Sequence, residues 1–237
     1  MSENSAESVN KPLRHIAFIM DGNRRWAKEH HLPKIMGHRK GAEVLKVLAK
    51  SAINDFGITT VSAFAFSTDN QRNRSAEERA DLMNLLAEYA SEQREEFMRE
   101  GIRLLCSGQL DSLPEHTRSA FQGTAEQTHN NKRGTLNMCV NYGGREEIID
   151  AVNRRLAEGP IATFTMNDLD SNLYAPDLPD VDLMVRTSGE KRTSAFMLWS
   201  GANTEYEFED KYWPDLTVED LARFVDIYSQ RDFRQGA

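Results

Sequence analysis

The sequence HIAFIMDGNRRWAKE, residues 15–29, begins with a short apolar run that stops at an Asp-Gly-Asn turn. An apolar run of four to eight residues bounded by a turn is typical of a buried strand. The polar and basic residues after the turn are compatible with the beginning of a helix. A strand, a tight turn and a helix in this order predict the first unit of an α/β sheet.

The rest of the chain repeats this alternation. The predicted strands cover residues 58–66, 102–108, 134–142, 181–189 and 195–199. The predicted helices cover residues 41–56, 76–100, 114–130, 144–157 and 217–230. Strands that alternate with helices form parallel sheets, so we expect an α/β fold with a mainly parallel central sheet flanked by helices. The N-terminal sequence MSENSAESVNKP is polar and has no apolar run, which predicts a disordered leader over residues 1–13. No repeat or long linker divides the rest of the chain, so we expect a single domain over residues 14–237.

Composition argues against two classes of protein. The 237 residues carry a net charge of −8, which disfavours nucleic-acid binding, and no apolar run is long enough to form a transmembrane segment. Residues 11–50 hold ten Lys or Arg and three Asp or Glu, a local charge of +7 that suits a small anionic ligand. Cys106 and Cys139 lie in apolar runs, so we expect buried thiols in a cytoplasmic protein.

Three polar residues, Asp21, Ser67 and Arg186, each lie where a predicted strand gives way to a loop. Ligands of parallel α/β sheets bind beyond the carboxyl ends of the strands. These three residues are therefore candidates for one binding site.

Asp21, Arg24 and Arg25 follow the first predicted strand. Backbone N–H groups at a turn and at the start of a helix bind phosphate, and guanidinium groups pair well with its oxygens. A carboxylate repels a phosphate unless a divalent cation lies between them, so Asp21 suggests Mg²⁺. Taken alone, these residues also fit an Asp-Gly turn before an amphipathic helix.

Four further polar segments are candidates for the same site. His38, in GHRKG (37–41), could donate a hydrogen bond to a diphosphate or transfer a proton, although a single histidine is often structural. The segment FSTDNQ (66–71) could bind a ligand or form an Asx-rich turn. The segment RTSGEKRTS (186–194) suits a second anionic group, and Glu205 is a candidate second metal carboxylate.

Together these segments resemble the cis-prenyltransferase family, whose bacterial archetype is undecaprenyl diphosphate synthase. The matching blocks are HIAFIMDGNRRWAK, GHRKGAE, AFSTDN, LNMCVNYGGREEI, DLMVRTSGEKRTSAFMLW and YWPD. They occur in order and at family-like spacing from about residue 14 to the end. The resemblance implies a Mg²⁺-dependent prenyltransferase, usually a homodimer, that condenses an allylic diphosphate with isopentenyl diphosphate and releases diphosphate.

The resemblance also implies roles for individual residues. The residues expected to act in catalysis are Asp21, Asn23, Ser67 and Asn70. The residues expected to bind the two isoprenoid diphosphates are Gly22, Asn23, Arg24, Arg25, Trp26, Lys34, His38, Arg74, Arg186, Arg192 and Ser194. The residues expected to hold Mg²⁺ are Asp21 and Glu205, the glutamate coming from the neighbouring subunit.

The growing hydrocarbon is expected in an apolar tunnel that excludes water. Candidates for its wall are Ala65, Leu82, Leu85, Leu86, Tyr89 and Val140. Asp81 places a charge near this predicted wall, where the family carries small or apolar residues. An unpaired carboxylate beside a hydrocarbon chain is costly, so we expect short products.

Other departures from the family pattern leave the coupling reaction open. Asp69 and Gln71 replace the usual Glu and Trp, one residue is inserted before position 76, and Lys34 replaces an arginine. Because the 66–75 segment handles the second substrate, one alternative is head-to-middle coupling of two dimethylallyl diphosphates into a branched or cyclic, lavandulyl-type product. A second alternative is a noncatalytic partner subunit, which the retained acidic and basic residues argue against.

Overall fold

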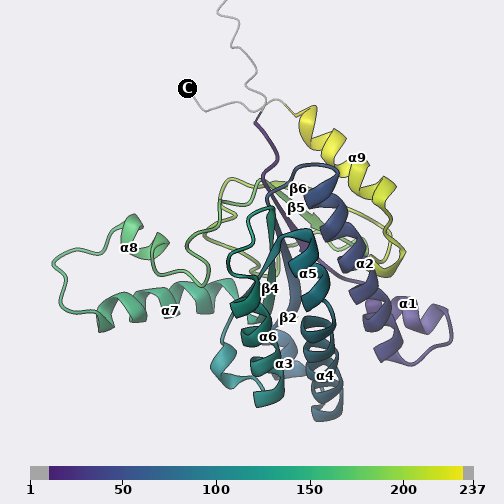
Figure 1. Ribbon diagram of the computed structural model, residues 1–237, viewed down its shortest axis with the longest axis horizontal. Helices are drawn as coiled ribbons and strands as arrows, with labels where there is room; N and C mark the ends of the chain where they lie inside the picture. The colour runs from purple at the N-terminus through teal and green to yellow at the C-terminus, as the bar shows by residue number, and fades with distance from the viewer. Residues whose placement is uncertain (1–10, 232–237) are drawn as a thin grey trace, which may run out of the picture.

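Six strands, all paired in parallel, form the central sheet of the computed structural model, which describes residues 11–231 (Figure 1). Their order across the sheet is β3-β4-β2-β1-β5-β6. The strands are β1 His15–Ile19, β2 Thr60–Ser67, β3 Ile102–Ser107, β4 Gly134–Tyr142, β5 Leu183–Arg186 and β6 Glu205–Phe208. The α/β fold class with a parallel central sheet is therefore confirmed.

Helices connect the strands and cover the sheet. They are α1 Asn23–Glu29, α2 Lys34–Asn54, α3 Thr68–Asn73, α4 Ala76–Glu92, α5 Arg94–Glu100, α6 Glu115–Thr128, α7 Gly144–Ala157, α8 Met166–Asp170 and α9 Val218–Ser229. Helices α2, α4, α5 and α6 pack together beside the strands, while α7 and α8 project to one side and α1 to the other (Figure 1). None of the helices in the described part of the chain has the length and apolar character needed to cross a membrane.

The side chains of β1 alternate between two apolar cores. Ile16 and Phe18 face the larger core, which α2, α4, α6 and α9 cover. Ala17 and Ile19 face a smaller core that contains Phe196. All four strand residues are at most 4 % exposed, which explains why residues 15–20 form an almost continuous apolar run in the sequence.

One predicted strand, AFMLW, is wrong. Residues 194–201 form consecutive turns, and Ser194, Ala195 and Met197 have positive φ angles of 50°, 57° and 46°. Phe196 is buried and stacks on Phe64 of β2, with ring centroids 4.3 Å apart. The apolar run therefore packs on a face of the sheet instead of joining it.

Several element boundaries also differ from the prediction. The last strand is β6, in a segment that reads as polar, and the short helix α3 begins within FSTDNQ and ends at Asn73. Helix α2 begins seven residues before position 41, and the predicted 76–100 helix divides into α4 and α5 at Gln93. Residues 1–10 of the expected leader lie outside the described residues, whereas Lys11 pairs with Asp182 at 2.8 Å and Leu13 packs against the larger core.

The strand order places the loops that follow β2, β1 and β5 side by side. Strand β1 lies between β2 and β5, and the chain leaves β1 toward β2 on one side and returns through β5 on the other. Such a switch point in a parallel sheet leaves a crevice at the carboxyl ends of the strands. Asp21, Ser67 and Arg186 lie at these three strand ends.

Candidate active site

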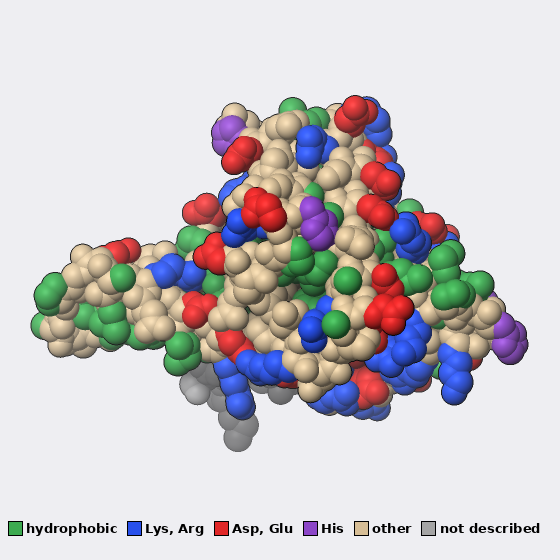
Figure 2. All heavy atoms as spheres, turned by 90° about the horizontal axis from the view of Figure 1, so that it is seen from below, with side chains coloured by type: hydrophobic (Ala, Val, Ile, Leu, Met, Phe, Trp, Pro, Cys, Tyr) green, Lys and Arg blue, Asp and Glu red, His purple; other side chains and the backbone are tan. Residues whose placement is uncertain are grey.

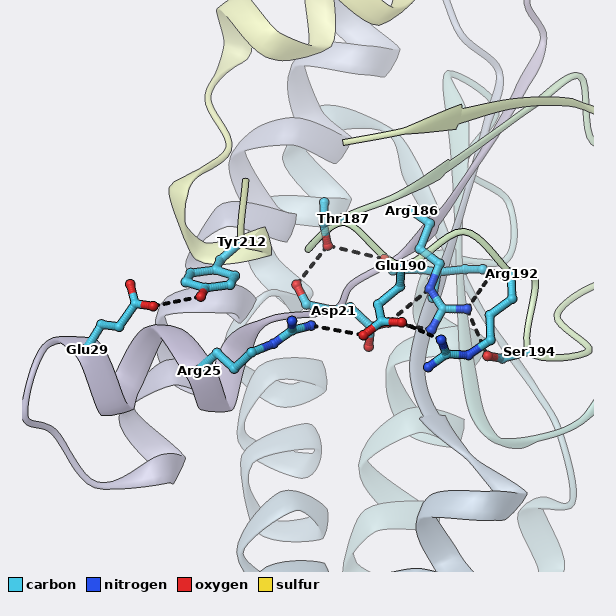
Figure 3. Close-up of polar contacts among 10 residues, drawn as sticks. Asp21, Arg25, Glu29, Arg186, Thr187, Glu190, Arg192, Ser194 and Tyr212 are labelled. Atoms are coloured by element: carbon cyan, nitrogen blue, oxygen red, sulfur yellow. Dashed lines mark hydrogen bonds and ion pairs between the residues drawn. The ribbon is translucent and has the colours of Figure 1, made fainter. Parts of the chain in front are cut away.

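Asp21 and Arg186 form the centre of the site (Figure 3). Arg186 donates from Nε and Nη2 to the Asp21 Oδ2 atom, at 3.0 and 2.6 Å. Its Nη1 atom donates to the Ser194 hydroxyl at 2.8 Å and to the Arg192 carbonyl. The guanidinium of Arg186 is buried. Its orientation is therefore fixed by hydrogen bonds to the loops after β1 and β5.

The loop after β1 is held by the loop after β5 and by the segment before α9. Thr187 donates its hydroxyl to the Asp21 carbonyl at 2.7 Å, and the backbone N–H of Trp213 donates to the same carbonyl at 2.9 Å. Gly22 has a φ of 101°, and a Cβ atom there would lie 2.7 Å from the Tyr212 ring. Only glycine fits this close approach with a left-handed backbone.

Arg25 and Arg192 meet at one carboxylate (Figure 3). Glu190 pairs with Arg25 at 3.5 Å and also with Arg192. The Arg25 guanidinium lies 5.5 Å from the centroid of the Tyr212 ring, whose hydroxyl donates to Glu29 at 2.7 Å. Arg25 is thus directed toward the loop that carries Arg186 and Arg192.

Ser67 and Asn70 form the N-terminal capping box of α3. The Ser67 hydroxyl accepts from the Asn70 backbone N–H at 3.0 Å, and Asn70 Oδ1 accepts from the Ser67 backbone N–H at 3.3 Å. These bonds use acceptor oxygens, which leaves the Ser67 hydroxyl proton and the Asn70 amide N–H groups to donate. Both side chains line the cavity described below.

His38 lies beside two arginines and is neutral near pH 7. Burial, followed by the positive charges of Arg74 and Arg24, lowers the pKa of His38 to about 3. Arg74 Nη1 lies 3.4 Å from His38 Nε2. Glu78 accepts from Arg74 at 2.9 Å and lies 3.7 Å from Arg24 Nη1. His38 therefore serves as a hydrogen-bonding group instead of a cation, and Glu78 holds both arginines next to it.

The polar side chains surround the mouth of a cavity of about 350 Å³. Figure 2 shows apolar side chains in the hollow of this face, with basic and acidic side chains around it. The polar lining residues among those predicted for the site are Asp21, Asn23, Arg25, His38, Ser67, Asn70, Arg74, Arg186, Arg192 and Ser194. The apolar lining residues among those predicted for the tunnel are Ala65, Leu82, Leu85, Leu86 and Tyr89.

Two tunnel expectations are not met. Val140 is buried in the larger core and does not line the cavity. Asp81 is exposed and lines a different pocket, together with residues at the start of α2. The carboxylate of Asp81 therefore lies outside the apolar wall, and the argument that it limits product length is wrong.

A second, more open cavity of about 620 Å³ adjoins the first. Gly22, Arg24 and Lys34 line it, and Asp21, Asn23, Arg25, His38 and Arg74 line both cavities. Trp26 lines neither cavity: its indole N–H donates to Asp215 at 2.7 Å and its ring stacks on His30. We therefore do not assign Trp26 to substrate binding.

Asp21 suits a metal ion. Its Oδ2 atom takes both Arg186 bonds, and within residues 11–231 no hydrogen bond or ion pair involves Oδ1. The same residues contain no group of three His, Cys, Asp or Glu side chains that could hold a metal. Mg²⁺ is commonly bound by one or two carboxylates together with substrate phosphates, so Asp21 with a diphosphate fits this ion.

Glu205 of the same chain lies far from Asp21. It begins β6 and is level with Leu183 and Ile16 in the neighbouring strands. At about 3.3 Å per residue, the five positions from Ile16 to Asp21 correspond to roughly 16 Å along the sheet. The Glu205 carboxylate pairs instead with Arg231. A single chain therefore does not bring the two expected metal ligands together.

The structure adds residues that the sequence argument did not assign. Glu190, Glu78 and Thr187 contact the predicted site residues. Asn23 donates to the Met20 carbonyl at 2.7 Å, and its Oδ1 faces Gly41, where a Cβ atom would lie only 2.2 Å away. Glu190 is the one acidic residue in the arginine-rich 186–194 segment, and this position between arginines could have identified it from the sequence.

Comparison with known proteins agrees with this geometry. The family model described as putative undecaprenyl diphosphate synthase matches residues 19–236. The chain belongs to this family. An isoprenyl transferase of Thermotoga maritima is 42 % identical over 226 residues, with 94 % of this chain and 96 % of that protein covered. The (2E,6E)-farnesyl-diphosphate-specific ditrans,polycis-undecaprenyl-diphosphate synthase of Micrococcus luteus is 37 % identical over 228 residues, with 94 % and 91 % covered.

Solved structures show the same fold. Lavandulyl diphosphate synthase from Lavandula x intermedia, in complex with dimethylallyl diphosphate, superposes with a TM-score of 0.88 at 29 % identity and covers 94 % of this chain and 97 % of that one. A probable undecaprenyl diphosphate synthase from Campylobacter jejuni superposes with a TM-score of 0.79, also at 29 % identity, and covers 93 % of this chain and 97 % of that one. The resemblance drawn from the sequence blocks is confirmed, and this member of the family is a prenyltransferase.

Proposed function

We propose that this prenyltransferase condenses an allylic diphosphate with isopentenyl diphosphate and releases inorganic diphosphate. The observation that carries the proposal is the cavity of about 350 Å³, which joins a mouth containing Asp21, Arg25, Arg186 and Arg192 to an apolar interior. A diphosphate suits the mouth, and a hydrocarbon chain suits the interior.

The site residues divide between the two substrates. Arg24, Arg25 and His38 border the wider cavity and receive the allylic diphosphate. Arg192 and Ser194, on the loop after β5, receive the diphosphate of isopentenyl diphosphate. Asp21 would hold Mg²⁺, and the ion, when bound, would supply positive charge that stabilises the negative charge of the leaving diphosphate.

The neighbouring donors stabilise the same charge. Arg25 and the fixed guanidinium of Arg186 already lie there before reaction, so little reorganisation is needed. The alkene of the second substrate attacks the allylic carbon, and one proton is then lost. Ser67 and Asn70 have donor groups at the cavity, and we assign them to the second substrate and its proton.

A second candidate is head-to-middle coupling of two dimethylallyl diphosphates. The similarity to lavandulyl diphosphate synthase favours it, together with Asp69 and Gln71 in the segment that would handle the second substrate. The noncatalytic alternative is not proposed, because Asp21, Arg186 and Ser194 are brought together with good hydrogen-bond geometry.

We also propose that two copies assemble and that the partner supplies Glu205 to the metal. The projecting α7 and the residues near it carry exposed apolar side chains, with Ile149 60 %, Leu156 53 % and Met166 71 % exposed. Several exposed apolar side chains on one projecting part of the molecule support a protein partner there. Both cysteines are free thiols, consistent with a cytoplasmic protein.

Product analysis tests the proposed reaction. The protein is incubated with Mg²⁺ and dimethylallyl or geranyl diphosphate, with and without isopentenyl diphosphate. We expect linear products only when isopentenyl diphosphate is present. Branched or cyclic products from dimethylallyl diphosphate alone would support the second candidate, and no diphosphate release under either condition would contradict both.

A further inference from the structure

Tyr212 lies against the turn that connects β1 to α1 (Figure 3). A Cβ atom added to Gly22 would lie 2.7 Å from Cδ1 and 2.9 Å from Cβ of Tyr212. The Tyr212 side chain therefore packs on the turn that also carries Asp21, and only a residue without a side chain leaves room for it there.

The backbone that carries Tyr212 is fixed on both sides. Trp213, which is buried, donates its backbone N–H to the Asp21 carbonyl at 2.9 Å and its indole N–H to a carbonyl of α2 at 2.8 Å. The Lys211 carbonyl accepts from the Ser188 backbone N–H at 2.8 Å. The position of the Tyr212 ring is thus set by the loops after β1 and β5 and by α2.

The ring of Tyr212 also extends along α1. Its hydroxyl donates at 2.7 Å to Glu29, the last residue of this helix. The hydrogen bond to this carboxylate raises the pKa of Tyr212, so the hydroxyl keeps its proton and remains a donor. Arg25 lies between Gly22 and Glu29 in the sequence, and its guanidinium is 5.5 Å from the ring centroid (Figure 3).

Arg25 needs a support of this kind. Its side chain is long and 49 % exposed, and its ion pair with Glu190 spans 3.5 Å. Fixing such a side chain costs rotamer entropy, and an aromatic face attracts a guanidinium. A bound diphosphate competes with Glu190 for the N–H donors of Arg25, but it does not compete with the ring. The N–H donors lie in the guanidinium plane and stay available while the ring contacts its face.

We propose that Tyr212 is a positioning residue, whose ring holds Arg25 at the mouth and so raises the affinity for the allylic diphosphate. The inference rests on the role that the proposed function gives to Arg25. Tyr212 lines neither of the two adjoining cavities, so it acts through Arg25 and does not touch the substrate. A cation–π contact at an exposed site contributes a factor of about two to five in affinity.

Binding of geranyl thiolodiphosphate, whose C–S bond resists cleavage, measures this contribution without turnover. The analogue is titrated by calorimetry in the presence of Mg²⁺. Tyr212→Leu removes the ring but keeps an apolar side chain against the turn, and it should weaken binding about two- to fivefold. Tyr212→Phe keeps the ring and should bind nearly as tightly as the wild type. In turnover assays, KM for isopentenyl diphosphate should be the same in all three proteins.

Two arginine backgrounds distinguish positioning from a general structural role. In an Arg25→Gln background, Tyr212→Leu should cause no further loss of binding. In an Arg24→Gln background it should cause its full loss, because Arg24 lies on the same helix but pairs with Glu78, at 3.7 Å. Equal losses in the two backgrounds, equal losses in Tyr212→Phe and Tyr212→Leu, or wild-type affinity in Tyr212→Leu would overturn the proposal. A wild-type chain that does not bind the analogue contradicts the proposed function itself, and the role of Tyr212 with it.

Discussion

At the scale of single residues, Asp21 has two separable tasks. Its Oδ2 atom fixes the buried Arg186, while Oδ1 is assigned to the metal. Asp21→Asn keeps an oxygen acceptor for Arg186 but loses the negative charge that a cation needs. The two tasks therefore respond differently to this change.

We expect Asp21→Asn to lower kcat by about 100-fold or more, since metal assistance is worth several kcal/mol. The melting temperature should fall by no more than a few degrees. Mg²⁺-dependent turnover and thermal unfolding measure the two effects, with Asp81→Asn as an exposed control. Near-normal Mg²⁺-dependent turnover would show that Asp21 is not the metal ligand.

Arg192 tests the division of the two diphosphate sites. Lysine retains the charge but lacks the planar fork that pairs with two phosphate oxygens. One charge-assisted hydrogen bond is worth about 1.5–3 kcal/mol, and the exposure of Arg192, 63 %, favours the lower end. Arg192→Lys should therefore raise KM for isopentenyl diphosphate about tenfold and leave KM for the allylic substrate nearly unchanged. Equal increases for both substrates would argue against separate sites.

The sequence predicts the site residues better than it predicts their contacts. Asp21, Ser67 and Arg186 could be grouped because each follows a strand of a parallel sheet, a rule that does not depend on side-chain detail. Asp81 was misplaced, because its orientation depends on how α4 is rotated against α2 and the sheet. A helical stripe shows which residues share a face, but it places residues at the border of that face poorly.

At the scale of elements, the contact between α1 and α2 positions both Arg25 and His38. A Cβ atom on Gly37 would lie 2.0 Å from the backbone oxygen of Asn23, the first residue of α1. Gly123, in α6, is a contrasting case, since the nearest atom to an added Cβ atom is the end of the Arg94 side chain at 3.7 Å. The same substitution should therefore have opposite effects in the two helices.

Gly37→Ala should lower the free energy of unfolding by about 1–3 kcal/mol, because one of the two helices must move. It should also weaken diphosphate binding, since that movement displaces His38 and Arg25. Gly123→Ala should raise the free energy of unfolding by up to about 1 kcal/mol through helix propensity. Denaturant titration of both variants is the measurement. Equal effects in the two helices would contradict the close contact.

The elements that the sequence mispredicts share a physical cause. AFMLW reads as a strand because it is apolar and short, yet positive φ angles at Ala195 and Met197 turn it onto the sheet. β6 reads as polar because it lies at the edge, where side chains such as Tyr206 are exposed. The local sequence pattern indicates well which residues are buried, but tertiary contacts decide which segments pair as strands of the sheet.

At the scale of the whole molecule, the buried His15 and the half-buried His38 link folding to pH. Burial lowers the pKa of His15 to about 4, although the Pro179 carbonyl and the nearby Asp182 oppose this shift. The His15 ring is held on both sides, with Nδ1 2.7 Å from the Pro179 oxygen and Nε2 2.8 Å from the Ser62 hydroxyl. His38, with a pKa of about 3, faces Arg74 and Arg24. Both rings remain neutral in the folded chain at mildly acidic pH.

In the unfolded chain these histidines regain a pKa near 6.5. Between about pH 6.5 and pH 4 the unfolded state therefore binds more protons than the folded state, and the free energy of unfolding falls as pH falls. His15 alone contributes a loss of about 3 kcal/mol across this window, with a slope of up to about 1.4 kcal/mol per pH unit. His38 adds a second contribution with the same sign.

We therefore expect the protein to be fully stable above about pH 7 and to lose stability steadily below pH 6.5. His15→Gln removes one titrating ring, so it should reduce the slope between pH 6 and pH 4.5 by about 1.4 kcal/mol per pH unit, even if it lowers stability at pH 7 by disturbing the bond to Ser62. Denaturant titrations at several pH values and one fixed protein concentration give this slope directly. Since the comparison uses slopes, a constant loss in the variant does not affect it. An identical slope in wild type and variant would mean that His15 carries its proton in the folded chain.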